Sequence, residues 1–196
     1  MRIGIDCGHG GLDEQGNYVT PGKRSLHPVD GEVFYEGVNN RKYGIEYAKV
    51  LEKFGHEVVF IVDPYDYKDV PLSTRATIAN SKDLDLLVSI HSNAARVPKG
   101  LKTSTARGYG VYISPQASSR THEVADLWSK EMSETFPDLK NRGKKERLFT
   151  MVHRTICPAI LLELEFHTND EAVRLLRSWE FRFKTALVLA NAINNL

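Results

Sequence analysis

The sequence predicts an α/β fold, namely a single-domain, three-layer sandwich in which a mostly parallel (mixed) central sheet carries helices on both faces. Three observations predict it. Short apolar runs typical of buried strands alternate with amphipathic stretches of helical period. Several of these runs end on histidine or acidic residues, as strands do where a sheet binds a ligand. The chain has 196 residues and shows no repeat, low-complexity stretch or linker, so we expect residues 1–196 to form a single domain.

The first half of the chain predicts alternating strands and helices. In order, we expect a strand over 2–6, a helix over 36–54, a strand over 57–62, a helix over 73–80 and a strand over 85–93. The first strand runs into glycines around His9, which place the imidazole on a bend. Ser73 is the expected N-cap of the second helix. Arg75 lies in its first turn, where it opposes the helix dipole, so we expect it to have a partner elsewhere.

Residues 12–35 and 95–108 are the two long irregular segments. Loops of this length usually border a site or are mobile. His27 and Asp30 in the first are conceivable ligands, but we expect them to be solvated. The second segment is basic. A solvated loop is the simpler interpretation, and the functional alternative is that it contacts an anionic polymer.

The second half of the chain repeats the alternation. The expected elements are a strand over 110–114, a helix over 115–136, a polar run over 141–147, a strand or turn under the sheet over 148–152, a strand that begins after Pro158, a short helix opened by a capping box at 168–171 and a helix over 179–194. The strand after Pro158 carries Glu163 and Glu165 at its C-terminal end. A buried carboxylate is costly unless a partner or metal meets it, so these residues are candidates for chemistry.

Composition and charge narrow the class of function. The chain is 41% hydrophobic and 26% charged, with a formal net charge of +1, which argues against general attraction to nucleic acid or to an anionic membrane. No apolar run approaches the length of a membrane span, and the first residues lack a secretory signal. Cys7 and Cys157 are too few for a disulfide framework; free thiols are the default expectation, and a single bridge between them is the alternative. We expect a monomer that is made in the cytoplasm and does not insert into membranes.

Histidines at the ends of two strands point to a metal. A single histidine in that position is more often structural, but right-handed crossovers bring parallel strand ends to one edge of the sheet. His9, His91 and a carboxylate meeting there would form a His₂Glu set with an open position, the pattern of catalytic zinc. Such an ion lowers the pKa of water toward about 7, and a separate glutamate could carry the proton. The sequence therefore predicts metal-assisted hydrolysis of an amide, ester or similar bond.

Four ordered blocks carry a family resemblance. They are Ile5-Asp-Cys-Gly-His-Gly-Gly11, then Glu36-Gly-Val-Asn-Asn40, then Arg75 with Ala79-Asn80 and Ser89-Ile-His-Ser-Asn93, and finally Pro158-Ala-Ile-Leu-Leu-Glu163 with Phe166 and Asn169. Together they resemble the zinc-dependent N-acetylmuramoyl-L-alanine amidases of the family-3 type, over nearly the whole chain. The resemblance implies one Zn²⁺ ion and, as substrate and partner, bacterial peptidoglycan. It implies cleavage of the amide between the lactyl group of muramic acid and the first L-alanine of the stem peptide.

Roles for individual residues follow from the same resemblance. It implies His9, Glu36 and His91 as zinc ligands and Glu163 as the catalytic acid/base. Arg75 and Asn80 would support the central block, and Asn93 is a further candidate for support or substrate binding.

Two positions depart from the family pattern. Cys7 stands where alanine is common, and we expect a small core residue. Glu165 stands where glycine is usual. Strand alternation puts Glu163 and Glu165 on one face, so neighbouring carboxylates are expected, one with a raised pKa. The proton-carrying role is then open to either, and register with the family favours Glu163.

Alternatives to the amidase remain at this point. One is a zinc peptidase that cuts within the stem peptide, and another is a peptidoglycan-binding module without turnover. We expect residues 1–196 to be a single catalytic amidase domain without a separate cell-wall-binding domain. Together with the lack of a leader, this favours a phage endolysin released through a holin, and the alternative is a secreted autolysin lacking its leader.

Overall fold

The computed structural model describes residues 1–196 and contains one six-stranded sheet with the order β2-β1-β3-β6-β4-β5. Its strands are β1 (Arg2–Cys7), β2 (Glu57–Phe60), β3 (Leu86–Asn93), β4 (Tyr109–Ile113), β5 (Asn141–Glu146) and β6 (Ala159–Phe166). Strands β2, β1, β3 and β6 are parallel neighbours. Strand β4 is antiparallel to β6 and parallel to β5. The mostly parallel, mixed sheet that the sequence predicts is therefore confirmed.

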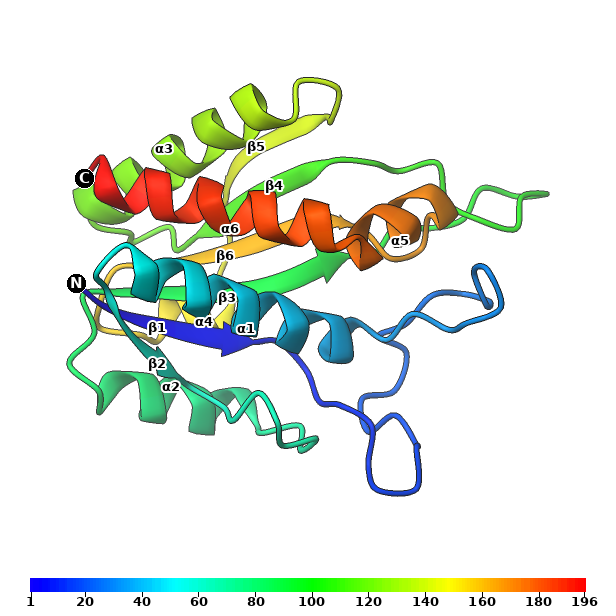
Figure 1. Ribbon diagram of the computed structural model, residues 1–196, viewed down its shortest axis with the longest axis horizontal. Helices are drawn as coiled ribbons and strands as arrows, with labels where there is room; N and C mark the ends of the chain where they lie inside the picture. Colours follow the sequence, from blue (N-terminus) through cyan, green and yellow to red (C-terminus); the bar gives the residue numbers. More distant parts are fainter.

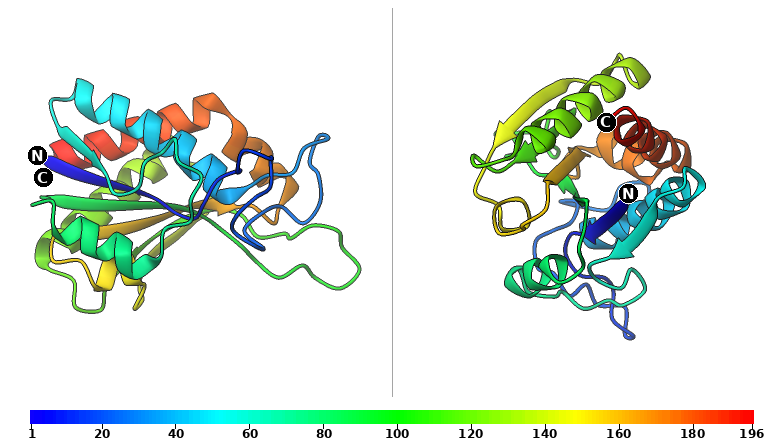
Figure 2. Two further views of the ribbon diagram at one scale, coloured as in Figure 1. Left: turned by 90° about the horizontal axis from the view of Figure 1, so that it is seen from below. Right: turned by 90° about the vertical axis from the view of Figure 1, so that its left-hand side faces the viewer.

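Six helices cover the two faces of this sheet. They are α1 (Glu36–Lys53), α2 (Leu72–Asn80), α3 (Ser119–Thr135), α4 (Thr150–His153), α5 (Asp170–Arg177) and α6 (Trp179–Asn194). Helix α6 packs against both α1 and α3 over one face, whereas α2 and α4 lie together on the other (Figure 2). This arrangement confirms the three-layer sandwich.

The hydrophobic core has two parts, one on each side of the sheet. The larger joins β1, β3 and β6 to α1, α3 and α6 and includes Tyr43 and Trp128, both fully buried. The smaller packs Met151 and Val152 of α4 against Leu161 of β6. Strands covered on both faces need apolar side chains at successive positions, which explains the continuous apolar runs in the sequence.

Several predicted boundaries and elements differ from the structure. Helix α2 begins at Leu72 after Pro71, so Ser73 is not its cap. Helix α5 is capped by Asn169, whose side chain accepts a hydrogen bond from the Ala172 amide, so Thr168 is not the cap. The polar run is the edge strand β5, and residues 150–153 form a single turn of helix, which rules out the strand alternative there. This turn does lie under the sheet, because Met151 and Val152 are buried there.

The carboxyl ends of β1, β3 and β6 point to one end of the molecule (Figure 1). Residues 12–35 and 95–108 project at that end, while both chain termini lie at the opposite end. None of the helices combines the length and the apolar character that crossing a membrane requires.

The 12–35 loop is anchored to helix α5. Asp30 forms a bidentate ion pair with Arg174, and His27 Nε2 lies 3.1 Å from Asp170 Oδ2. Arg177 donates to the main-chain oxygens of Val29 and Glu32. His27 is partly exposed and Asp30 is exposed, as expected of solvated side chains, and their ion pairs also fasten the loop to α5.

Candidate active site

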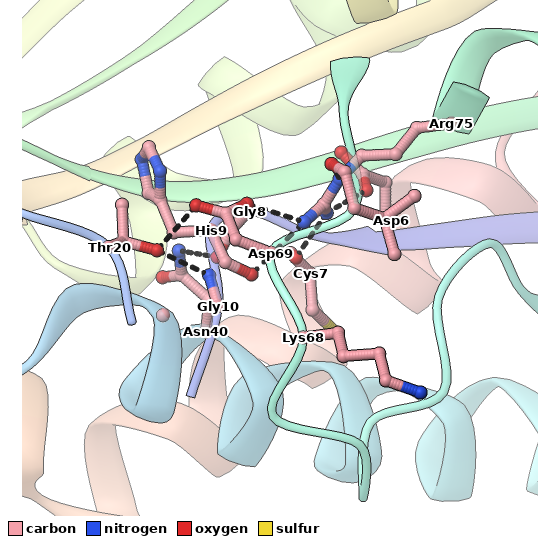
Figure 3. Close-up of polar contacts among 12 residues, drawn as sticks. Asp6, Cys7, Gly8, His9, Gly10, Thr20, Asn40, Lys68, Asp69 and Arg75 are labelled. Carbon is pink, nitrogen blue, oxygen red and sulfur yellow. Dashed lines mark hydrogen bonds and ion pairs between the residues drawn. The ribbon is translucent and has the colours of Figure 1, made fainter. Parts of the chain in front are cut away.

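The segment after β1 holds His9 at the carboxyl edge of the sheet. His9 adopts a positive φ of 67°, a conformation that needs support in a residue with a side chain. Its main-chain oxygen accepts hydrogen bonds from Arg41 at 2.8 Å and Arg75 at 3.1 Å, and Asn40 donates to the Gly8 oxygen at 3.1 Å (Figure 3). Donors from α1 and α2 thus fix this bend from both sides of the sheet.

Arg75 also forms a buried ion pair with Asp6. The two groups are each 1% exposed, and Nη1 lies 2.8 Å from Asp6 Oδ1. The same nitrogen donates to the Cys7 oxygen, and Ser89 of β3 donates to the other oxygen of Asp6 at 2.6 Å. Arg75 thus has the partner outside its helix that its position led us to expect, and it ties α2 to β1 and, through Asp6, to β3.

Asn80 and Asn93 lie elsewhere in the framework. Asn80 donates to the Arg154 oxygen and accepts from the Ile156 amide, so it holds the connection between α4 and β6. Asn93 ends β3, where its side chain accepts from Ala94 and its main-chain oxygen accepts from His167. Neither contact involves His9, Glu36 or His91.

Glu36 lies between the two histidines that the sequence singles out. Its Oε1 atom is 3.4 Å from His9 Nε2 and 3.2 Å from His91 Nδ1, and it accepts from the Ser92 amide at 3.1 Å. The carboxylate is almost fully buried, whereas both imidazoles are partly open to solvent. The structure therefore brings together the N-terminus of α1 and the ends of β1 and β3 around one small space.

The pKa values of this group reflect its close packing. Burial alone would raise the pKa of Glu36, but hydrogen bonds from His9 and His91 outweigh it and hold the pKa well below its usual range. Burial alone would lower the pKa of His91, yet its contact with Glu36 raises it above the ordinary value. The carboxylate is therefore ionised at neutral pH, as a metal ligand must be.

The three side chains fit a zinc ion. One ligand atom from each of His9, Glu36 and His91 lies within 4.8 Å of the others. With bonds of about 2.0–2.1 Å, ligand atoms around a tetrahedral zinc lie about 3.3 Å apart. The contacts of Glu36 Oε1 with the two imidazoles, at 3.4 and 3.2 Å, match that spacing. Two imidazole nitrogens and one carboxylate oxygen are also the donors of catalytic zinc sites.

Glycine at position 8 makes room for one of these ligands. A Cβ atom there would lie 2.2 Å from His91 Cε1, so any side chain would push the imidazole aside. The glycine-rich segment thus both bends the chain at His9 and lets His91 approach.

Glu163 faces the same cavity. The cavity has a volume of about 310 Å³ and is lined by His9, His91, Lys23 and Glu163, with apolar walls from Leu72, Leu148, Phe149, Met151 and Leu161. Glu163 Oε2 is buried and has no hydrogen-bond partner in the protein. Burial raises the pKa of Glu163 to about 7, with Glu36 adding to the shift and His91, Lys23 and Lys145 opposing it. An unpartnered carboxyl with such a pKa is suited to carry a proton.

Glu165 has a different environment from Glu163. His91 pairs with Glu163 and Asn93 with Phe166, so β6 contains one extra residue over this interval, and the strand alternation on which we relied does not hold. Glu165 is fully buried, accepts from Arg107 at 3.0 Å and from the Gly108 amide at 2.9 Å, and has a φ of 156°. It anchors the end of the basic 95–108 loop.

Two further side chains complete the surroundings. His167, which sequence reasoning missed, lies with Nδ1 3.7 Å from Glu36 Oε2 and 3.0 Å from Ser92 Oγ. Its only sequence signal was its place just after the strand that carries Glu163. Cys7 is a buried core thiol, as expected; a Cβ at Gly44 would lie 2.4 Å from its sulfur, and burial raises its pKa to about 12.

Comparison with known proteins identifies relatives along the whole chain. The profile of the N-acetylmuramoyl-L-alanine amidase family matches residues 3–195. CwlM of Bacillus licheniformis, named an N-acetylmuramoyl-L-alanine amidase, is 25% identical over 98% of this chain and 67% of its own length. The endolysin of Bacillus phage SPP1 is 30% identical over 56% of this chain and 39% of its own.

Solved structures agree with this result. The amidase AmiC2 of Nostoc punctiforme matches with a TM-score of 0.78 and 25% identity, covering 100% of this chain and 96% of that one. The match therefore extends over the complete sheet and its helices and includes the edge where His9, Glu36 and His91 meet. The chain belongs to the N-acetylmuramoyl-L-alanine amidase family.

Proposed function

We propose that this amidase is zinc-dependent and that it cuts the amide between the lactyl group of N-acetylmuramic acid and the first L-alanine of the peptidoglycan stem peptide. One observation carries the proposal: His9 and His91 of the His9–Glu36–His91 group line the same open cavity as the unpartnered carboxyl of Glu163. His9, Glu36 and His91 would hold one Zn²⁺ ion. When bound, the ion would polarise the scissile carbonyl and make water more acidic.

The protein side chains supply the proton transfers. Glu163 would accept a proton from the attacking water and return it to the amine of L-alanine as that amine leaves. A pKa of about 7 allows both steps near neutral pH. Because the Arg75 and Arg41 hydrogen bonds fix the main chain at His9, the ligand set is held in place before substrate arrives.

Digestion of purified peptidoglycan tests the bond that is cut. The enzyme should release new L-alanine amino termini and no new reducing sugar ends, a chelator should stop the reaction, and added Zn²⁺ should restore it. New amino termini from residues within the stem peptide would instead identify a peptidase. Binding to the wall without any release would identify a module that lacks turnover.

Substitution tests the role of Glu163. Glu163→Gln should retain zinc, measured by elemental analysis of the purified protein, and lose at least about a hundredfold in turnover, as expected for the removal of a general acid/base. Glu134→Gln, an exposed change on α3, is the matched control and should leave both unchanged. Wild-type turnover by Glu163→Gln would refute the assignment.

A further inference from the structure

Strand β4 is the neighbour of β6 on the side away from β3. Glu163 and Leu161 are two residues apart on β6 and share a face. Tyr112 of β4 pairs with Leu161, and Gly110 pairs with Glu163. Gly110 is buried and adds no side chain beside Glu163, whereas Tyr112 lies on the same face two residues further along β4. The Tyr112 side chain is therefore next to Leu161, which lines the active-site cavity.

Lys145 lies on the next strand, β5, beside Tyr112. It pairs with Tyr112 across β4 and β5, and its Nζ atom lies 5.6 Å from the centre of the Tyr112 ring. That ring in turn lies 5.3 Å from the ring of Phe149, which lines the active-site cavity. Lys145 forms no ion pair, whereas the adjacent Lys144 pairs with Asp126 at 2.7 Å. The ammonium of Lys145 is thus available to a ligand.

Lys23 brings a second positive charge from the 12–35 loop. Its main-chain oxygen accepts a hydrogen bond from the Glu36 amide at 2.9 Å, which fixes its backbone beside the metal-binding group. Its side chain is exposed, lines the cavity with Glu163 and forms no ion pair with any acidic residue. Two lysines without an acidic partner therefore lie near Glu163, Lys23 in the wall of the cavity and Lys145 beyond the rings of Tyr112 and Phe149.

The substrate offers a matching anion. The second residue of the stem peptide is a D-glutamate linked onward through its side chain, so its α-carboxyl group branches from the peptide as either a free acid or an amide. The D-glutamate follows the L-alanine directly. Its α-carboxyl group therefore lies about two extended residues, or roughly 7 Å, from the scissile bond. A free carboxylate there would pair with ammonium groups, whereas an amide would leave both lysines without a charged partner.

We propose that Lys23 and Lys145 bind this free α-carboxylate, so that the enzyme selects stem peptides with an acid, and not an amide, at the second residue. The inference rests on the proposed amidase function and names the form of substrate that the same site prefers. Lys23 and Lys145 are specificity residues in this scheme and take no part in proton transfer.

Matched substrates test the selection. Two muramyl tripeptides that differ only in the acid or amide at the second residue are compared by kcat/KM with the zinc-loaded enzyme. The acid should be preferred about tenfold, as expected for one charge-assisted hydrogen bond. Lys23→Gln and Lys145→Gln should each reduce this preference by lowering kcat/KM for the acid alone. Lys144→Gln, on the same strand, should keep it.

The outcomes separate the two proposals. Equal cleavage of acid and amide by the wild type overturns the selection and leaves the amidase intact. An equal loss on both substrates in the lysine variants also overturns it, because the lysines would then act through Glu163. Failure to cleave the lactyl–alanine bond in either tripeptide and in whole peptidoglycan overturns the amidase function and, with it, this inference.

Discussion

Replacing Glu163 by glutamine should stabilise the metal-free protein, and the gain should depend on pH. Burial raises the pKa of Glu163 from an ordinary value of 4.5 to about 7 in the fold. Well below pH 4.5 the carboxyl is protonated in both the folded and the unfolded chain, and the contribution of the neutral Glu163 to the free energy of unfolding is fully present. As pH rises toward 7 the unfolded chain releases the proton first, so stability is lost progressively and the loss is complete above the folded pKa.

The size of this effect follows from the shift. A difference of about 2.5 pKa units corresponds to roughly 3 kcal/mol in the free energy of unfolding. Glutamine has nearly the same shape and no charge, so Glu163→Gln and wild type should have equal stability near pH 4, and the variant should be more stable by up to about 3 kcal/mol at pH 8.

Urea denaturation of chelator-treated protein at a series of pH values measures the difference. Subtracting the wild-type free energy of unfolding from that of Glu163→Gln at each pH removes the pH dependence of the other carboxylates, which the two proteins share. A constant difference from pH 4 to pH 8 would show that Glu163 has an ordinary pKa and would refute the argument that its burial prepares it for proton transfer.

Three further predictions concern the framework and the metal. Arg75→Met should lower the free energy of unfolding by about 3–5 kcal/mol in urea denaturation, because it leaves the Asp6 carboxylate buried with Ser89 alone; an added Asp6→Asn should recover part of the loss. Gly44→Ala should cost about 1–3 kcal/mol by crowding the Cys7 sulfur, and Cys7→Ala should relieve it in the double variant; additive effects would contradict the contact. Zn²⁺ at about a thousand times its dissociation constant should stabilise the chelated protein by about 4 kcal/mol, seen as a higher melting temperature, and His91→Ala should abolish that rise.

The central strands, and the site residues at their carboxyl ends, could be predicted from the sequence because they leave a local signal. Strands β1, β3 and β6 are apolar over successive positions, as strands buried on both faces must be, and His9, His91 and Glu163 interrupt that pattern where each strand reaches the edge. Glu36 has no such signal, since an acidic residue in the first turn of a helix is ordinary. Its place came from the family resemblance.

Other features depend on contacts that are distant in sequence. Strand β5 is polar because it pairs only with β4 at the edge of the sheet, so it has no apolar period to detect. The irregular pairing near Glu165 depends on Arg107 and Gly108, which lie more than fifty residues away along the chain. His167 likewise reaches Glu36 only because β3 and β6 are neighbours.

The attachment of the 12–35 loop to α5 has a consequence for how such an enzyme can diversify. The loop that presents Lys23 is tied down by Asp170, Arg174 and Arg177, all on the outer helix that follows β6. Changes on that helix would shift one side of the active-site cavity without altering any of the three proposed metal ligands. Preference for a particular bacterial wall could therefore be retuned from the molecular exterior, while the hydrolytic apparatus stays as it is.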